Sequence, residues 1–376
     1  MTAGFYCPLP PARTGVAEYG MALLGELRRR GRVEVCPKTC DIALYHLGNN
    51  PLHGAIYRRS LEEPGVIVLH DLSLHHFLLG ALPEREYIEE VAYNLGEWNR
   101  SLARELWNGR ASSATDPRYF EIPLLKRALQ RARAVVVHNP EAKRIVLRQM
   151  PEARVIEIPH LYAPPAQAAP ESGVLRYRRS IGVTGDEFLF GVFGYLRESK
   201  RLISVLEAFA AVRAENGRAA LLVAGDFVSS DLERAAGPLL HSPGVIRRPF
   251  LPEDEFQLAL AATDACINLR SPAAGETSGV AIRMMGLGKP VLVTDSAEYE
   301  RFPEDACIRI PAGAAERESL RRHMGLLTSV AVVARAVGRH AAHYVGERHR
   351  LEEAGSQYWD LLCEYCSSSP SAQPGR

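Results

Sequence analysis

Short apolar runs alternate with amphipathic stretches along most of this chain, and no other feature of the sequence constrains the fold as strongly. The stretch 202–217 has a helical pattern, with Leu202, Leu206 and Phe209 on one stripe. In the second half the apolar runs recur about every 25 residues, as FLFGVFG (188–194), AALLVAGD (219–226), GVIRRPF (244–250), DACINL (264–269), KPVLVTD (289–295) and ACIRIP (306–311). Strands that alternate with helices build a parallel sheet, so this half predicts a doubly wound α/β domain.

The first half repeats this alternation less regularly. Its predicted strands are AGFYC, IALYHLG, GVIVLH, AVVVH and RVIEIP, and its predicted helices cover 16–30, 85–107, 121–132 and 140–149. The segment YAPPAQAAPESG (162–173) is rich in proline and small residues, as linkers are. We therefore expect a Rossmann-like domain over 1–165 completed by a C-terminal helix at about 350–366, a second Rossmann-like domain over 173–349, and a disordered tail over 367–376.

Composition and charge exclude several classes of protein. The 376 residues include 45 Lys or Arg and 44 Asp or Glu, without the basic excess that is typical of nucleic-acid binding. No apolar run reaches the ~18 residues of a membrane span, although peripheral contact with the inner face of a membrane is compatible with the sequence. The chain begins without a signal-peptide pattern, and its seven cysteines are scattered, which favours a reduced cytoplasm.

Two groups of residues have spacings that also occur in metal sites. Cys363 and Cys366 form one CxxC pair, but no second pair or nearby histidine completes a zinc set, so one face of a terminal helix is the favoured interpretation. Asp71 and His75 have the i, i+4 spacing of a helix and His76 lies beside them, but no further ligand is evident. We therefore expect no metal.

Polar residues that follow the predicted strands are the first candidates for a ligand site, because doubly wound sheets bind ligands beyond the carboxyl ends of their strands. Lys200 and Arg201 follow one strand and begin a helix, where free backbone N–H groups and the helix dipole favour a phosphate or diphosphate. A solvated helix start is the alternative for such a pair alone. His70 ends another strand and is followed by Asp71, and a lone histidine there is more often structural.

Two loops have residues that suit an anionic or hydroxylated ligand. The turn at Gly15 falls between the first strand and a helix, but it is neither GxGxxG nor a P-loop, so a dinucleotide dehydrogenase or an ATPase is disfavoured. The loop GETSG also leads into a helix, with Thr277 or Ser278 as its N-cap and Gly279 allowing close approach to the backbone. Glu276 in this loop can accept hydrogen bonds from sugar hydroxyls, or merely complement the helix dipole.

The ordered set GVFGYLRESKRL, LLVAGD, SPAAGETSG and GLGKPVLVTD resembles the second half of retaining glycosyltransferases of the GT-B fold, family four. The resemblance covers nearly the whole chain, including VLHDL in the first half and a last helix that in this family returns to the amino-terminal domain. It implies transfer of a sugar from a nucleotide-sugar donor to an acceptor with retention of anomeric configuration. It also implies that the second domain holds the donor, that the first holds most of the acceptor, and that no cofactor or metal is required.

The resemblance assigns roles to individual residues. Lys200 matches the lysine of the basic pair that holds the donor diphosphate, and its partner would be Arg197 or Arg201, because Gly-Tyr-Leu stands where the family has Gly-Arg-Leu. Gly15 matches an early glycine loop, and His70 matches the histidine near the reacting carbon. Glu276 matches, with a shift of one residue, the glutamate that contacts the donor sugar.

The chain departs from the family at its second signature glutamate, which contacts the ribose. Counting back from Gly288, this position is occupied by Arg283. Side chains on a helix lean toward its amino terminus, so the Arg283 guanidinium could point back at the loop. We expect it to pair with Glu276, with contact to the donor phosphate or ribose as the alternative.

Three functions remain open on this basis. A transferase needs no covalent nucleophile, because the leaving diphosphate can help to remove the acceptor proton while positioned charges stabilise the transition state. A sugar-nucleotide epimerase or hydrolase would bind the same donor, and a non-catalytic partner subunit would explain the missing glutamate. The sequence leaves the oligomeric state open and the acceptor unidentified, whether a sugar, a lipid-linked or a small molecule.

One surface in the first half bears on a lipid-linked acceptor. The residues involved are Arg100, Arg104, Arg110, Trp98 and Trp107. They would meet a lipid phosphate, or they form a solvated helix face with two aromatic anchors, and we favour the second interpretation.

Overall fold

The computed structural model describes residues 1–367, which form two compact units. The first unit comprises Met1–Leu161, Ala274–Thr277 and the C-terminal segment from His349, and the second comprises Tyr162–Ala273 and Ser278–Arg348. The predicted linker 162–173 begins at the boundary between Leu161 and Tyr162. The sequence-based boundaries assign residues 274–277 to the second domain, whereas their contacts group them with the first unit.

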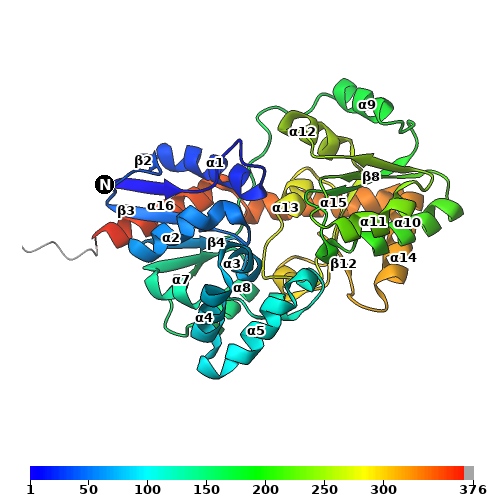
Figure 1. The fold of residues 1–376 in the computed structure, drawn as a ribbon. Helices are drawn as coiled ribbons and strands as arrows, with labels where there is room; N and C mark the ends of the chain where they lie inside the picture. The colour runs from blue at the N-terminus through cyan, green and yellow to red at the C-terminus, as the bar shows by residue number, and fades with distance from the viewer. Residues whose placement is uncertain (368–376) are drawn as a thin grey trace, which may run out of the picture. The chain divides into compact units, whose positions relative to one another are not determined.

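The first unit contains a sheet of six parallel strands in the order β2-β1-β3-β4-β5-β6 (Figure 1). Its strands are β1 (Thr2–Tyr6), β2 (Arg32–Val35), β3 (Ile42–Leu47), β4 (Val66–Leu69), β5 (Ala134–Val137) and β6 (Val155–Glu157). From β1 the chain adds β2 on one side and then returns to add β3 on the other. The point where the strand order reverses therefore lies between β1 and β3.

The helices of the first unit lie between these strands in the chain, except α16, which is the last element within residues 1–367. They are α1 (Gly15–Arg28), η1 (Pro51–His53), α2 (Gly54–Glu62), α3 (His75–Ala81), α4 (Glu84–Leu95), η2 (Glu97–Asn99), α5 (Arg100–Asn108), η3 (Arg110–Ser112), α6 (Arg118–Glu121), α7 (Lys126–Arg131), α8 (Pro140–Gln149) and α16 (Leu351–Ser367).

The second unit has the same plan, with six parallel strands in the order β12-β11-β10-β7-β8-β9. Its strands are β7 (Phe188–Phe193), β8 (Ala219–Ala224), β9 (Val245–Arg248), β10 (Ala265–Asn268), β11 (Val291–Thr294) and β12 (Ile308–Ile310). Its helices are α9 (Glu171–Ser180), η4 (Glu198–Lys200), α10 (Leu202–Glu215), α11 (Ser230–Leu240), α12 (Glu253–Ala262), α13 (Gly279–Gly286), η5 (Ala297–Tyr299), α14 (Glu316–Ser329) and α15 (Ala331–Arg348). Here the strand order reverses between β7 and β10.

The core of the second unit follows from the two-residue period of its strands. Along β7, Leu189 and Phe193 belong to one buried apolar cluster, and Phe190 and Val192 belong to another. Successive side chains of a strand point to opposite faces of the sheet, so the two clusters lie on its two sides. Both faces are covered, which explains why this strand is apolar throughout.

The predicted doubly wound fold is confirmed, but several of its elements need correction. The predicted helix 121–132 is wrong in its first part, because α6 ends at Glu121 and α7 begins only at Lys126, with Leu124 between them at a φ of 54°. The predicted helix 85–107 is wrong at one point, because α4 ends at Leu95 and Gly96 adopts a φ of 103°, which only glycine tolerates well. The edge strand β2 is not predicted, since RVEV contains only two apolar residues. The other predicted strands agree with the observed ones to within a few terminal residues.

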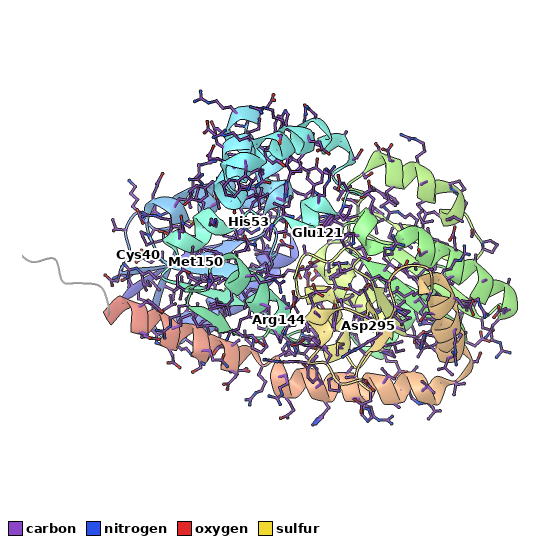
Figure 2. All side chains as sticks on the ribbon, turned by 90° about the horizontal axis from the view of Figure 1, so that it is seen from below. Cys40, His53, Glu121, Arg144, Met150 and Asp295 are labelled. Carbon is purple, nitrogen blue, oxygen red and sulfur yellow. The ribbon has the colours of Figure 1, made fainter. Side chains whose placement is uncertain are left out.

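The helix α16, drawn in faint red in Figure 2, packs against α1 in the first unit, as the resemblance predicts. A Cβ at Gly31 would overlap the Trp359 ring, so a larger residue there would force this ring to move. The Tyr19 and Tyr358 hydroxyls are 2.9 Å apart and both side chains are buried.

Of the predicted tail 367–376, Ser367 ends α16 and the remainder lies outside the described residues. None of the helices within residues 1–367 combines the length and the apolar character that a membrane span requires.

The buried hydroxyl pair gives a test of how α16 is held. We expect Tyr358→Phe to lower the free energy of unfolding of the first unit by about 1–3 kcal/mol, because the Tyr19 hydroxyl loses its partner. The double variant Tyr19→Phe/Tyr358→Phe should recover most of this loss. Urea unfolding followed by tryptophan fluorescence reports on this unit alone, since all three tryptophans (Trp98, Trp107 and Trp359) belong to it. Additive losses in the double variant would contradict the prediction.

Candidate functional site

Lys200 is a buried lysine at the point where the strand order of the second sheet reverses. It ends η4, directly after β7, and is only 8 % exposed. Its Nζ donates a hydrogen bond to the carbonyl oxygen of Phe193. Burial, reinforced by the neighbouring Arg270 and Arg197, holds the pKa of Lys200 well below its usual value. A lysine with two arginines nearby favours the binding of an anion such as a diphosphate, because the anion stabilises the protonated lysine.

Arg270 is a residue that the sequence interpretation missed. It follows β10, the strand on the other side of the reversal point, and its backbone N–H donates to Thr294 Oγ1 at 2.9 Å. The next residue, Ser271, donates its N–H to the Ser199 carbonyl at 2.8 Å, which ties this loop to the one that contains Lys200. Its position just beyond a predicted strand was a signal that could have identified Arg270.

The two arginines predicted beside Lys200 have different surroundings. Arg197 is exposed and its charge acts on Lys200. Arg201 has a left-handed backbone (φ 58°), and its Nε lies 2.9 Å from a carboxylate oxygen of buried Glu316. The charge of Arg201 is thus balanced within the second unit, and a role for either arginine in donor binding stays a prediction.

Arg283 has contacts that bear on its role. Its Nη2 is 2.6 Å from Glu253 Oε1, and its guanidinium lies 4.9 Å from the centre of the Phe256 ring. These contacts join α13 to α12 within the second unit. The predicted pairing with Glu276 is untested by them and stays a prediction. The N-cap of α13 is Ser278, whose Oγ accepts from the Ala281 N–H, and Gly279 is the first residue of the helix.

The loop Ala274–Thr277 is held by the first unit. The Leu72 N–H donates to the Ala274 carbonyl at 2.9 Å, and the Asn139 amide donates to the Gly275 carbonyl and to Thr277 Oγ1. Glu276 Oε2 accepts a hydrogen bond from the Ala274 N–H at 2.8 Å, so the carboxylate folds back over its own loop. Leu72 follows β4 and Asn139 follows β5, so the structure brings the Glu276 loop to the carboxyl edge of these two strands. Glu276 lies two residues after Ala274, which is bonded to Leu72.

The glycine turn after β1 has the predicted position. Thr14 is the N-cap of α1 and its Oγ1 accepts from the Val16 N–H, and Gly15 begins the helix. Apart from its chain neighbours and its own helix, nothing lies within 4 Å of a Cβ built on Gly15, so the space beside this residue is open. The predicted contact of Gly15 with a donor stays a prediction.

His70 belongs to a cluster of four histidines at the carboxyl edge of the first sheet: His46, His70, His138 and His160. The His46 Nδ1 and His70 Nε2 atoms are 2.9 Å apart, and the His70 and His138 rings are 5.2 Å apart. The Tyr19 ring contacts the whole cluster. Only His70 was predicted, although a histidine at or just after four successive strands was visible in the sequence.

Burial keeps the cluster neutral. It holds the pKa values of His46 and His70 well below 6.5, and it lowers those of His138 and His160 to about 4 and about 3. The neighbouring histidines lower the pKa of His70 further. His70 is therefore an uncharged hydrogen-bonding group near neutral pH, able to contact a hydroxyl but unsuited to hold a phosphate by charge.

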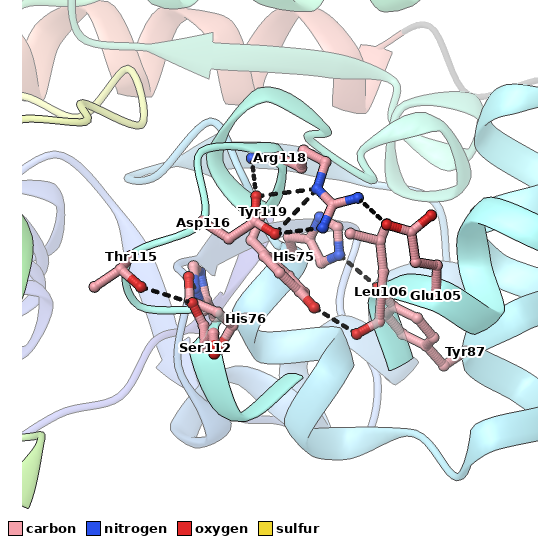
Figure 3. A network of polar contacts seen from close by, with 11 residues as sticks. His75, His76, Tyr87, Glu105, Leu106, Ser112, Thr115, Asp116, Arg118 and Tyr119 are labelled. Atoms are coloured by element: carbon pink, nitrogen blue, oxygen red, sulfur yellow. Dashed lines mark hydrogen bonds and ion pairs between the residues drawn. The ribbon is translucent and has the colours of Figure 1, made fainter. Parts of the chain in front are cut away.

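His75 is structural, and Figure 3 shows the polar network around it. Its Nδ1 is 2.9 Å from the Ile122 carbonyl and its Nε2 is 2.7 Å from the Tyr87 hydroxyl, so both ring nitrogens are occupied. Beside it, Arg118 joins Asp116 and Glu105 in ion pairs. Within residues 1–367, no group of three or more His, Cys, Asp or Glu residues has the arrangement of a metal site.

No family model matches the chain, and no curated protein matches it by sequence. Solved structures do match over nearly the whole length of both chains. WaaG, a glycosyltransferase involved in lipopolysaccharide biosynthesis, has a TM-score of 0.65 and 17% identity, and the match covers 96% of this chain and 99% of WaaG. Anabaena HepE in complex with UDP-glucose has a TM-score of 0.65 and 14% identity, with 97% and 100% covered. Sucrose-phosphate synthase from Thermosynechococcus elongatus has a TM-score of 0.67 and 16% identity, with 98% and 100% covered. The likeness shows that the chain has the GT-B fold.

The histidine cluster predicts loss of stability in mild acid. The pKa of each buried histidine is lower in the folded state than the ~6.5 of the unfolded chain, so the unfolded state binds more protons below that pH. The contribution of these histidines to the free energy of unfolding is therefore fully present above about pH 6.5. It falls as the pH is lowered toward about pH 4, by about 1.4 kcal/mol per pH unit for each histidine. Urea unfolding between these pH values, followed by tryptophan fluorescence, measures the slope.

His53 provides the control for this prediction. It is fully buried, burial lowers its pKa to about 4, and its Nδ1 lies 2.8 Å from the His46 carbonyl. The variant His53→Asn retains a donor near that position but cannot titrate. Its unfolding should therefore take up one proton less, and its free energy of unfolding should fall less steeply as the pH is lowered. A wild-type protein equally stable across this range would contradict the prediction.

Proposed function

We propose that this protein is a glycosyltransferase that moves a sugar from a nucleotide-sugar donor to an acceptor with retention of anomeric configuration. The observation that carries the proposal is the basic group of Lys200, Arg270 and Arg197 at the reversal point of the second sheet. Ligands of doubly wound sheets bind at such points, and a buried lysine with two arginines near it fits a diphosphate. The GT-B fold supports the same conclusion, since it is shared with glycosyltransferases, one of them in complex with UDP-glucose.

The residues of the first unit suit recognition of the transferred sugar. Glu276 has a carboxylate that accepts hydrogen bonds from hydroxyls, and His70 is a neutral imidazole at the same sheet edge. Neither is arranged as a charged clamp for phosphate. We infer that they contact sugar hydroxyls, while Lys200 and Arg270 neutralise the leaving diphosphate.

The proposed reaction needs no covalent intermediate. The bond between the anomeric carbon and the diphosphate oxygen breaks, and the acceptor oxygen bonds to that carbon on the same face. The acceptor proton passes to the departing diphosphate, whose negative charge is stabilised by Lys200. Catalysis then consists of positioning and charge stabilisation.

The alternatives differ in what they need from an acceptor. An epimerase or hydrolase would convert the nucleotide sugar without any acceptor, and a non-catalytic subunit would bind it unchanged. Product analysis with and without added sugar, lipid-linked or small-molecule acceptors separates them. A thermal-shift panel of nucleotides and nucleotide sugars identifies the donor first, because a ligand that binds the folded state raises Tm.

Lys200 provides the central mutational test. We expect Lys200→Met, like Glu276→Ala, to lower transfer on the order of 100-fold or more without unfolding the protein. The matched control is Lys289→Met in the same unit. Burial also lowers the pKa of Lys289, but its Nζ donates to the Ala261 carbonyl before β10, at the opposite end of the sheet. Equal turnover in the Lys200 and Lys289 variants would contradict the site.

Proton uptake on binding gives an independent test. Because the pKa of Lys200 is lowered in the free protein, a bound diphosphate should raise it, so that binding takes up to about one proton and weakens as pH rises. Calorimetry with a nucleotide sugar in buffers of different ionisation enthalpy measures this proton. The linkage should vanish in Lys200→Met and persist in Lys289→Met. Binding without proton uptake in the wild type would oppose the assignment.

A further inference from the structure

Asn139 lies where the first sheet meets the loop that contains Glu276. It is the second residue after β5, next to His138, and it is the N-cap of α8. Its Oδ1 accepts a hydrogen bond from the Ala142 N–H at 2.8 Å. The side chain is only 3 % exposed, so its amide must find its partners within the protein.

The Nδ2 group of Asn139 holds residues on both sides of Glu276. It donates to the Gly275 carbonyl at 2.9 Å and to Thr277 Oγ1 at 3.0 Å. Both amide hydrogens and the amide oxygen are thereby used. One buried side chain, bonded to the start of a helix, thus also bonds the backbone immediately before Glu276 and the side chain immediately after it.

Two further contacts make the loop conformation specific. Gly275 has a φ of 76°, and a Cβ there would lie 2.7 Å from the Leu72 Cβ, so the loop approaches this segment as closely as glycine allows. The Leu72 N–H donates to the Ala274 carbonyl at 2.9 Å. The contacts of Asn139 and Leu72 thus hold the backbone on the N-terminal side of Glu276, whose Oε2 accepts from the Ala274 N–H at 2.8 Å.

We propose that Asn139 is a positioning residue that sets the geometry of Glu276 toward the hydroxyls of the transferred sugar. The inference rests on the proposed function, because it assumes that Glu276 contacts that sugar. Holding a group in its reactive geometry before substrate arrives removes an ordering cost from the catalytic step. Asn139 therefore acts on turnover, while the diphosphate site of the second unit acts on nucleotide binding.

The residue type is decisive for this role. Aspartate is as good an N-cap as asparagine, because its carboxylate also accepts from the helix N–H groups. Aspartate has no amide hydrogens, however, and would place a carboxylate oxygen against the Gly275 carbonyl. The substitution Asn139→Asp therefore separates the helix cap, which it keeps, from the loop contact, which it removes.

The experiment compares Asn139→Asp with Asn216→Asp. Asn216 lies at the end of α10 in the second unit, and its Oδ1 accepts from the Arg218 N–H at 3.2 Å, a contact that aspartate preserves. We expect Asn139→Asp to lower kcat about 10- to 100-fold with little change in the Kd of the nucleotide. Hydrogen exchange of the amides in 274–279 should become faster. Asn216→Asp should match the wild type in all three measurements.

A second variant keeps the proposal testable if Asn139→Asp folds poorly. Thr277→Val removes one acceptor of the Asn139 amide and leaves the cap of α8 intact, so it should give a smaller loss of kcat and a smaller increase in exchange. Wild-type kcat and exchange in both variants would overturn the proposal. If the wild type fails to bind any nucleotide sugar, the proposed function fails, whereas the exchange measurements still decide whether Asn139 holds the loop.

Discussion

Parallel strands within one sheet all end at the same edge, and this constraint decides where the candidate functional groups of each unit lie. In the second unit, Lys200 and Arg270 follow strands that flank the reversal point and are joined through their loops. In the first unit, His70 and Asn139 follow neighbouring strands. Residues far apart in the chain therefore become neighbours without any dedicated contact between them.

Both units bury basic side chains whose pKa values are lowered, but the surroundings of these side chains differ. In the second unit, Lys200 lies near two arginines, an arrangement that favours the arrival of an anion. In the first unit, the buried histidines are surrounded by one another and by Tyr19, so they offer hydrogen bonds without adding positive charge. The proposed roles of the two units, diphosphate binding and hydroxyl recognition, follow this difference.

The sequence predicted most of the strands because their apolar runs are set by burial on both faces, a local and repetitive requirement. The position of Lys200 after a strand and before a helix was also visible in the sequence, while its binding of a diphosphate stays a prediction. Arg270 was not singled out, because its proximity to Lys200 depends on how two loops lie together in the folded protein. The break between α4 and α5 was missed because Gly96 is tolerated inside a helical pattern, while its observed φ is set by the surrounding structure.

The loop at Glu276 shows what local sequence patterns cannot predict, namely which unit holds it. Its glycine, its glutamate and its helix cap are apparent in the chain, and so is its likeness to a sugar-binding segment. That the loop is held by the first unit follows only from Asn139, which lies 136 residues from Gly275 in the chain. Strand and helix periods arise from neighbours along the backbone, so the chain itself prescribes the two sheets. Hydrogen bonds between distant residues arise only once both sheets exist, so the folded protein alone decides which unit holds the loop.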